Sequence, residues 1–230
     1  HGGEITVESF SIYKNGGGGL KNYLSSPSVV NCTFTANNAG YGAGIFNSYS
    51  SLTLINSIFS ANTASDKGGG IFNDLSNLIL SNCQFISNTA YFGGGLWIWG
   101  YSTNITNTHF LNNRADYGGG IYNYAASSLT ITKCIFSANA GNAQGGGIYN
   151  QVTSPTIKQS NFEANTSAAG GGIYNIEASP NISNCSFSFN SATNGGGVMN
   201  HLGFDPTFIN CTFYGNNATE HGGGIYNEGG

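Results

Sequence analysis

The chain of 230 residues is 39% hydrophobic and 13% aromatic but only 7% charged, whereas an ordinary globular domain has about 25% charged residues. This much apolar surface excludes an intrinsically disordered chain. The net charge of −4 includes no basic run, so we expect no nucleic-acid partner, and no apolar stretch reaches the roughly 18 residues of a transmembrane segment.

A repeat of 25 or 26 residues runs through the whole chain. Its clearest mark is Phe-x-x-Asn, which occurs eight times and begins at Phe34, Phe59, Phe85, Phe110, Phe136, Phe162, Phe187 and Phe213. Self-similarity at such a period is typical of solenoid proteins, in which each repeat stacks on its neighbours. We therefore expect residues 1–230 to form a single repeat domain.

The segment before each Phe predicts a strand, a bend and a second strand. An apolar residue lies five positions before the Phe and a small residue two before it, as at Val29 and Cys32. A spacing of two keeps side chains on one face of a strand, but a spacing of three does not, so the chain must bend in between. The bend position is Asn in six of the eight repeats, beginning with Asn31, and Asn tolerates left-handed backbone.

The Asn of the Phe-x-x-Asn motif also recurs in every repeat. If like residues stack in register, these side chains form a column whose amides bond from one repeat to the next, as in cross-β structures. The predicted ladder consists of Asn37, Asn62, Asn88, Asn113, Asn139, Asn165, Asn190 and Asn216.

Glycine triplets followed by an apolar residue, an aromatic residue and usually Asn complete each repeat, as in 68–73 and 118–123. Each glycine would cost roughly 1 kcal/mol in a helix, and β-branched and aromatic residues dominate the apolar positions, so these segments predict strands. The expected fold is all-β, a right-handed parallel β-helix (β-solenoid) of about eight to nine rungs, each 25–26 residues long and ~4.8 Å from the next.

The residue after the inward Ile, Leu or Val of the glycine motif forms an aromatic column. Strand alternation places this column on the outer face, where it would bind glycan faces or another molecule. Simple stacking of neighbouring rings is the alternative. The predicted interaction stripe consists of Phe46, Phe72, Trp97, Tyr122, Tyr149, Tyr174 and Tyr226, with Met199 in the same column.

The two motifs together resemble the polymorphic outer-membrane protein repeat, in which a Gly-Gly-Ala-Ile-type tetrapeptide and Phe-x-x-Asn alternate along a β-helical passenger domain. Phe-x-x-Asn matches in all eight copies, while the glycine motif departs toward Gly-Gly-Gly-Ile. The resemblance covers the whole chain and implies a secreted or surface-displayed bacterial protein that acts in adhesion. It brings no catalytic residues with it.

A polysaccharide lyase or hydrolase is the main alternative, because the β-helix class includes such enzymes. Glycoside hydrolysis needs two carboxylates roughly 5–9.5 Å apart. Asp66 and Asp116 occupy one column two rungs apart, hence ~10 Å from each other, and a lyase would pair Asp116 with the basic Arg114. Both Asp residues flank glycine-rich turns, where Asp is a common turn residue, so we favour a protein that is not an enzyme.

The histidines and cysteines predict neither a cofactor nor a required disulfide. The four histidines fall in different columns, without cysteines or carboxylates at ligand spacing, so no metal is expected. One column shared with Ser and Thr contains a cysteine on every second rung, which indicates small inward-facing core residues. These cysteines are Cys32, Cys83, Cys134 and Cys185. Cys185 and Cys211 lie on neighbouring rungs, where a disulfide is geometrically possible.

We interpret the chain as an extracellular or cell-surface protein with a structural or adhesive role. The sequence has no evident capping segment, although solenoid ends normally need one to remain soluble. We therefore expect an uncapped fragment or repeating unit whose open ends pair with copies of itself into a filament, a process that low surface charge favours. A glycan-binding module is the second alternative, and host or matrix glycans and proteins are the other expected partners.

Overall fold

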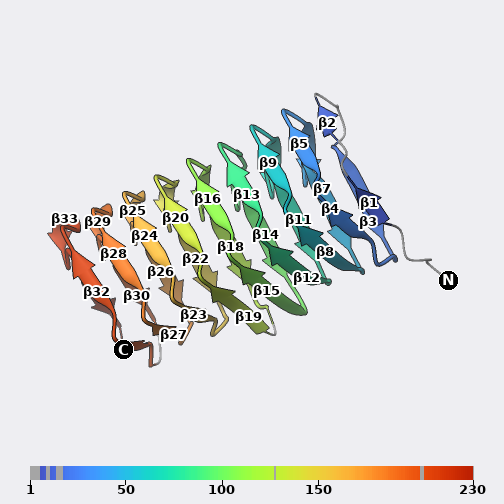
Figure 1. Ribbon diagram of the computed structural model, residues 1–230. Helices are drawn as coiled ribbons and strands as arrows, with labels where there is room; N and C mark the ends of the chain where they lie inside the picture. The colour runs from blue at the N-terminus through green and yellow to red at the C-terminus, as the bar shows by residue number, and fades with distance from the viewer. Residues whose placement is uncertain (1–5, 9–10, 14–17, 127, 203–204, 230) are drawn as a thin grey trace.

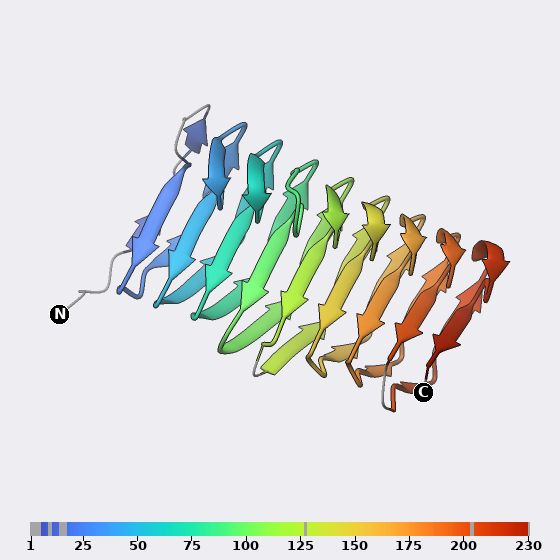
Figure 2. The same ribbon diagram turned by 180° about the vertical axis from the view of Figure 1, so that it is seen from behind.

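A computed structural model describes residues 6–8, 11–13, 18–126, 128–202 and 205–229. All regular elements in these ranges are strands, and all the strand pairs are parallel. The chain winds around one axis and stacks its rungs from one end to the other, so that the first described strand and the last lie at opposite ends (Figures 1 and 2). The expected parallel β-solenoid is confirmed.

Each rung contributes one strand to each of several sheets that run along the axis. Sheet 1 has nine strands in the described part of the chain: β1 (Thr6–Glu8), β4 (Ser28–Val30), β8 (Ser51–Ile55), β12 (Asn77–Ser81), β15 (Ser102–Thr106), β19 (Ser128–Thr132), β23 (Thr156–Lys158), β27 (Asn181–Ser183) and β31 (Thr207–Ile209). Sheet 2 follows it and contains the Phe of each repeat: β2 (Ser11–Tyr13), β5 (Thr33–Thr35), β9 (Ile58–Ser60), β13 (Gln84–Ile86), β16 (His109–Leu111), β20 (Ile135–Ser137), β24 (Asn161–Glu163), β28 (Ser186–Ser188) and β32 (Thr212–Tyr214).

Sheet 3 is less regular and lies before the glycine triplets. It consists of β6 (Asn38–Tyr41), β10 (Thr63–Lys67), β17 (Arg114–Tyr117), β21 (Ala140–Gln144), β25 (Thr166–Ala169), β29 (Ser191–Asn194) and β33 (Asn217–His221). Isolated bridges through Thr89 and Phe92 connect β10 to β17. Sheet 4 contains the aromatic column: β3 (Leu20–Tyr23), β7 (Ile45–Ser48), β11 (Ile71–Asp74), β14 (Leu96–Trp99), β18 (Ile121–Tyr124), β22 (Ile148–Gln151), β26 (Ile173–Ile176), β30 (Val198–His201) and β34 (Ile225–Glu228).

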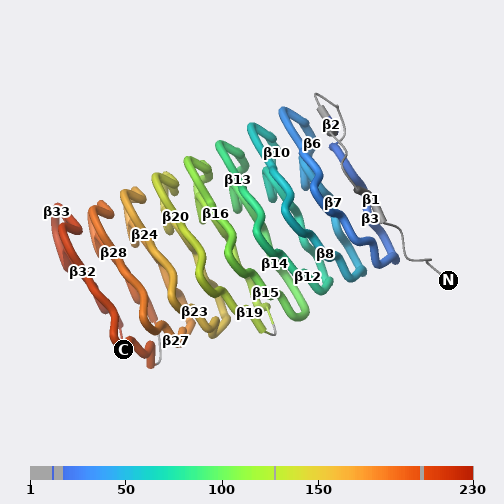
Figure 3. Tube along the Cα trace, viewed as in Figure 1, coloured from blue at the N-terminus to red at the C-terminus, as the bar shows by residue number. Residues whose placement is uncertain are grey.

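A residue with left-handed backbone turns the chain at each corner of a rung, and the path therefore repeats closely from rung to rung (Figure 3). Between sheets 1 and 2 this residue is the predicted bend position, where φ lies between 46° and 55° in all eight repeats. Lys133 and Gln159 adopt the same conformation where Asn is missing, because the stacked rungs impose it on them. Further corner residues, such as Ala36 and Tyr49, were not predicted.

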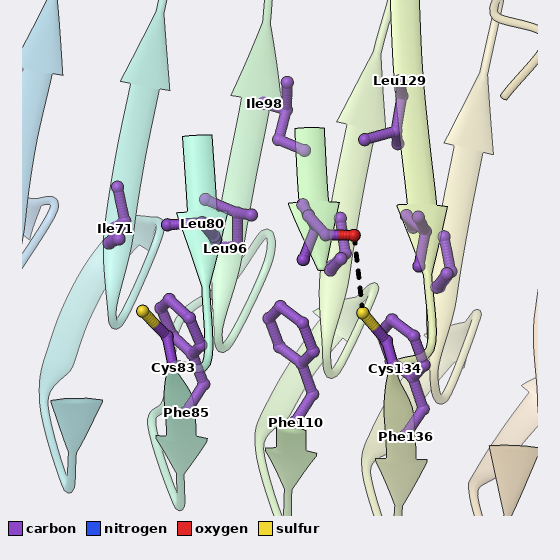
Figure 4. Close-up of a cluster of buried hydrophobic side chains, with 14 of the residues drawn as sticks. Ile71, Leu80, Cys83, Phe85, Leu96, Ile98, Phe110, Leu129, Cys134 and Phe136 are labelled. Atoms are coloured by element: carbon purple, nitrogen blue, oxygen red, sulfur yellow. Dashed lines mark hydrogen bonds between the residues drawn. The ribbon is translucent and has the colours of Figure 1, made fainter. Parts of the chain in front are cut away.

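The core is a set of inward columns that run along the axis. The Phe column is fully buried from Phe34 to Phe187, and its rings stack with centroids 4.7–4.9 Å apart, which matches the spacing of hydrogen-bonded strands. Figure 4 shows Phe85, Phe110 and Phe136 in this row. The rings also explain the third glycine of each triplet, because a Cβ on Gly70 would lie 2.7 Å from Cδ1 of Phe85.

The cysteine column lies inside the core, as its sharing of positions with Ser and Thr predicts. The thiol of Cys134 donates to the carbonyl of Ile105, and burial raises the pKa of Cys134 to about 12 and that of Cys83 to about 11. These thiols are therefore protonated and unreactive at neutral pH. Cys185 and Cys211 are both free thiols in the structure.

The Asn side chains of the Phe-x-x-Asn motif form one ladder of hydrogen bonds from Asn37 to Asn216. In the centre of the ladder, Nδ2 of Asn113 donates both to Oδ1 of Asn139 and to the carbonyl of Phe85. Oδ1 of Asn113 accepts from the backbone and side-chain nitrogens of Asn88. The ladder therefore satisfies both the amides and nearby backbone groups in an otherwise apolar interior.

A second Asn ladder follows the glycine motif in sheet 4 and was not predicted. It joins Asn47 to Asn73 and, further along, Asn123 to Asn150 and Asn175. Ile98 occupies the position between these two stretches. Because Ile98 supplies no amide, Nδ2 of Asn73 turns to the carbonyl of Ser76, and the buried Oδ1 of Asn123 has no hydrogen-bond partner among the described residues.

A second unsatisfied buried atom among the described residues, Oγ1 of Thr103, lies on the strand that follows Ile98, in a column where its neighbours are Leu78 and Leu129. We expect Thr103→Val to raise the free energy of unfolding by about 1 kcal/mol, because it removes a desolvated hydroxyl and preserves the side-chain shape. The matched control is Thr108→Val. The hydroxyl of Thr108 donates to the carbonyl of Thr106 and accepts from the amide of Cys83, so this change should destabilise by about 1–2 kcal/mol. Urea unfolding would measure the change in stability of each variant. A change in the same direction for both variants would contradict the prediction.

Candidate ligand-binding groove

The aromatic column of sheet 4 points away from the main core and forms a second apolar cluster on the outer side of the sheet. Its rings are nevertheless almost completely covered, with 2–8% exposure from Phe72 to Met199, and only Phe46 and Tyr226 at its ends are partly exposed. The prediction that this aromatic column is exposed is therefore wrong, although its side chains project from the outer face of the sheet as expected.

Part of the cover comes from aromatic residues that precede a glycine triplet and lean over the aromatic ring of the next rung. Tyr41 meets Phe72 in this way with ring centroids 5.4 Å apart, and Tyr117 meets Tyr149 at 5.8 Å. Phe92 lies edge-on to Tyr122 at 5.1 Å. These contacts join residues 30 to 32 positions apart, so strand alternation alone does not predict them.

The covered rings stack in two separate groups along the axis. Phe46, Phe72 and Trp97 form one stack, with centroids 5.0 and 4.6 Å apart. A second stack begins with Tyr122 and Tyr149, whose centroids lie 4.8 Å apart, and continues to Tyr174. Among the described ring contacts no stacked pair joins Trp97 to Tyr122, so the stack is interrupted at the step from β14 to β18.

A second row of side chains borders the column on its other side. These residues lie two positions after the aromatic column and therefore project from the same face of sheet 4. The row contains Asp74, Trp99, Tyr124 and Gln151, which pair in register from β11 to β22. Trp99 and Tyr124 are each 37% exposed. The spacing Trp-x-Trp and Tyr-x-Tyr is visible in the sequence and is the signal that could have located this row.

A groove with a volume of about 460 Å³ lies over this interrupted step, between the residues that cover the aromatic column and the row that contains Trp99 and Tyr124. Six of its side chains are aromatic, and the other two are an amine and a carboxylate: the lining consists of Lys67, Phe72, Asp74, Phe92, Trp97, Trp99, Tyr122 and Tyr124. A concave, mainly apolar site with a few polar groups is typical of a small-molecule or saccharide site.

The polar groups of the groove lie at its borders. Nζ of Lys67 lies 5.2 Å from the ring centroid of Trp97, and Oδ2 of Asp74 accepts a hydrogen bond of 3.0 Å from the hydroxyl of Ser48. Burial raises the pKa of Tyr122 to about 12, so its hydroxyl remains a donor at neutral pH. That hydroxyl donates to Oε1 of Gln151 at 2.6 Å.

The candidate catalytic residues lie outside this lining. Asp66 and Asp116 are on either side of Tyr91 along the axis, because the amides of Tyr91 and Asp116 bond to the carbonyls of Asp66 and Tyr91 respectively. The carboxylate of Asp116 accepts from Asn142, and a hydrogen bond to Asp66 is the main cause of the raised pKa of Tyr41. Arg114 is exposed at the start of β17.

Two of the four histidines make side-chain contacts near the end of the stack, whereas His1 lies outside the described residues. Nδ1 of His201 lies 2.9 Å from Oε2 of Glu228, and Nδ1 of His221 lies 2.9 Å from Oδ1 of Asn194. No three His, Cys, Asp or Glu side chains come together as a metal site within the described ranges. Those ranges also contain no helix of the length and hydrophobicity that a membrane span requires.

Comparison with known families agrees with this geometry. A family model described as a right-handed beta helix region matches residues 1–162 and 94–230, which together cover the whole chain. The chain belongs to the right-handed β-helix family. The curated proteins include no match to this β-helix.

Two solved structures of a bacterial surface protein are similar to the β-helix at low identity. The surface protein and adhesin PfbA of Streptococcus pneumoniae is 12% identical, with a TM-score of 0.30, over 99% of this chain and 90% of that one. A second structure of PfbA, described as a surface adhesin, is 11% identical, with a TM-score of 0.28, over 86% and 70% of the two chains.

Proposed function

We propose that this β-helix is an extracellular adhesive module that binds a glycan chain in the aromatic groove. The observation that carries the proposal is the set of six aromatic side chains between the amine of Lys67 and the carboxylate of Asp74. A sugar ring has apolar C–H faces and hydroxyl edges, so it matches a site in which aromatic surface is bordered by a donor and an acceptor.

The direction of the groove supports a polymeric ligand. Its two borders follow neighbouring rungs, from Lys67 to Phe92 on one side and from Asp74 through Trp99 to Tyr124 on the other, so it runs parallel to the solenoid axis. An extended glycan can lie along such a groove and contact several rungs at once. Multiple contacts along one chain are what an adhesive protein needs for retention on a matrix or cell surface.

Surface display in bacteria is the finer part of the proposal. It is supported by the alternation of the glycine motif with Phe-x-x-Asn, which resembles the polymorphic outer-membrane protein repeat, and by a chain with only 7% charged residues. The groove favours adhesion over catalysis, since its lining has one carboxylate, whereas glycoside hydrolysis uses a pair.

The groove can be tested with its own fluorescence, because the two tryptophans of the chain, Trp97 and Trp99, both line it. We expect binding of oligosaccharides on a glycan array, and a change of tryptophan emission on titration with those that bind. Trp99→Ala and Tyr124→Ala should each weaken binding by about tenfold in calorimetry, because each removes an exposed aromatic contact.

The control for these variants is Tyr214→Ala, which removes a 66% exposed tyrosine from sheet 2, away from the groove. It should leave the affinity unchanged. Absence of binding to any glycan, or equal binding by all variants, would refute the proposal. The enzyme alternative predicts instead that oligosaccharides are shortened on incubation and that Asp116→Asn prevents this.

End-to-end association of copies into a filament stays a prediction. It would pair the backbone groups of the last described rung, β31 to β34, with the first rung of another copy. Electron microscopy of the pure protein should then show filaments whose length increases with concentration. Short rods of uniform length at all concentrations would contradict self-assembly.

A further inference from the structure

Lys67 interrupts a run of aromatic residues that cover the first part of the aromatic column, whereas the same position further along the axis holds Gln144, Ala169, Asn194 and His221. The residues at the equivalent position on the neighbouring rungs are Tyr41, Phe92 and Tyr117, and each places an aromatic ring against the ring of the next rung. On the rung of Lys67 an ammonium group lies over Trp97 instead. A lysine side chain is long and flexible, so it can move aside where a packed ring cannot.

The charge of Lys67 has no carboxylate partner in the described part of the chain. The ion pair present there joins His201 to Glu228, whereas Nζ of Lys67 lies 5.2 Å from the ring centroid of Trp97 and 5.8 Å from that of Tyr41. A cation over an aromatic ring gains less than a cation that donates hydrogen bonds to a carboxylate. A ligand with a negative group therefore offers Lys67 a better partner than the one it has.

We propose that the groove selects acidic glycans, with Lys67 as the residue that determines this specificity; the inference rests on the proposed function. The sugar ring occupies the face of Trp97 that the ammonium covers in the free protein, and the displaced ammonium pairs with the carboxylate of a uronic or sialic acid. Asp74 on the opposite border repels that carboxylate and instead accepts hydrogen bonds from the hydroxyl groups of the sugar. The two borders thereby orient the sugar across the groove.

The test uses oligosaccharides that contain hexuronate or sialate, each compared with its own methyl ester. The ester keeps the sugar and the linkage but removes the charge. We expect the acids to bind roughly tenfold more tightly than their esters, as a charge-assisted hydrogen bond in a partly buried site predicts. Lys67→Gln should abolish this preference, so that each acid and its ester bind the variant with equal affinity. The preference of the wild type should also decrease as salt is added.

The matched control is Lys158→Gln, which makes the same change of charge at an exposed lysine of sheet 1 and should keep the preference. Thermal melting checks that the variants are folded. Esters bound as tightly as acids by the wild type, or a preference that survives in Lys67→Gln, would overturn this inference and leave the glycan-binding proposal intact. A protein that binds no glycan at all would overturn both.

Discussion

Replacing Asn113 with alanine is expected to lower the free energy of unfolding by about 3–5 kcal/mol, although the substitution removes only one small polar side chain. The Asn113 amide donates to Asn139 and to the carbonyl of Phe85, and it accepts from two nitrogens of Asn88. Removal leaves several of these buried groups without a partner, and each costs about 1–3 kcal/mol. Denaturant unfolding followed by circular dichroism would measure the loss.

The control for this prediction is Asn104→Ala, because Asn104 is an exposed asparagine in strand β15 of sheet 1. Exposed substitutions of this kind change stability by no more than about 0.5 kcal/mol. If Asn113→Ala lowered the free energy of unfolding by less than about 1 kcal/mol, water would be replacing the hydrogen bonds of Asn113, and the Asn column would not be a main source of stability.

Truncation of Phe110 to alanine is expected to lower the free energy of unfolding by about 3–5 kcal/mol. The Phe110 ring is fully buried and stacks on Phe85 and Phe136 at 4.8 and 4.9 Å, so both of its faces lose their contacts. The rungs on either side cannot close the cavity, because their backbones are joined by hydrogen bonds in register. Calorimetric or urea unfolding would measure the effect.

Phe213→Ala is the matched control for Phe110→Ala. Phe213 has one stacked neighbour within the described rungs, Phe187 at 4.7 Å, and is only partly buried. Its truncation should therefore cost less than half as much. Equal losses at the two positions would mean that the stacked rings do not stabilise one another through both faces.

The irregularities of the repeat are concentrated on the rung that carries the groove. Ile98 interrupts the second Asn ladder, and the two buried side-chain atoms that lack a partner in the described ranges, Oδ1 of Asn123 and Oγ1 of Thr103, lie on or beside this rung. The same rung supplies Trp97 and Trp99. Departures from a consistent pattern are expected where a sequence is selected for a site rather than for stability, which supports the placing of the site here.

The sequence by itself determined the class of fold, because a period of 25 or 26 residues with one buried Phe and one Asn per turn can bury its apolar side only by stacking. It also determined the inward columns, the left-handed bend after Val29 and its equivalents, and the ladder that contains Asn113. Each of these follows from strand periodicity within a few residues or from repetition of one motif, so no long-range geometry is needed.

Only the tertiary structure decided what lies on the outer face of sheet 4. Alternation correctly directs Trp97 and its equivalents outward, but it contains no information on the residues that lean over them from the preceding rung. That cover depends on the sharp turn at the glycine triplet and on the side chain before it, and the groove has Lys67 in its lining at that position. Contacts between residues some 30 positions apart come from the closure of a turn, and a local pattern does not encode them.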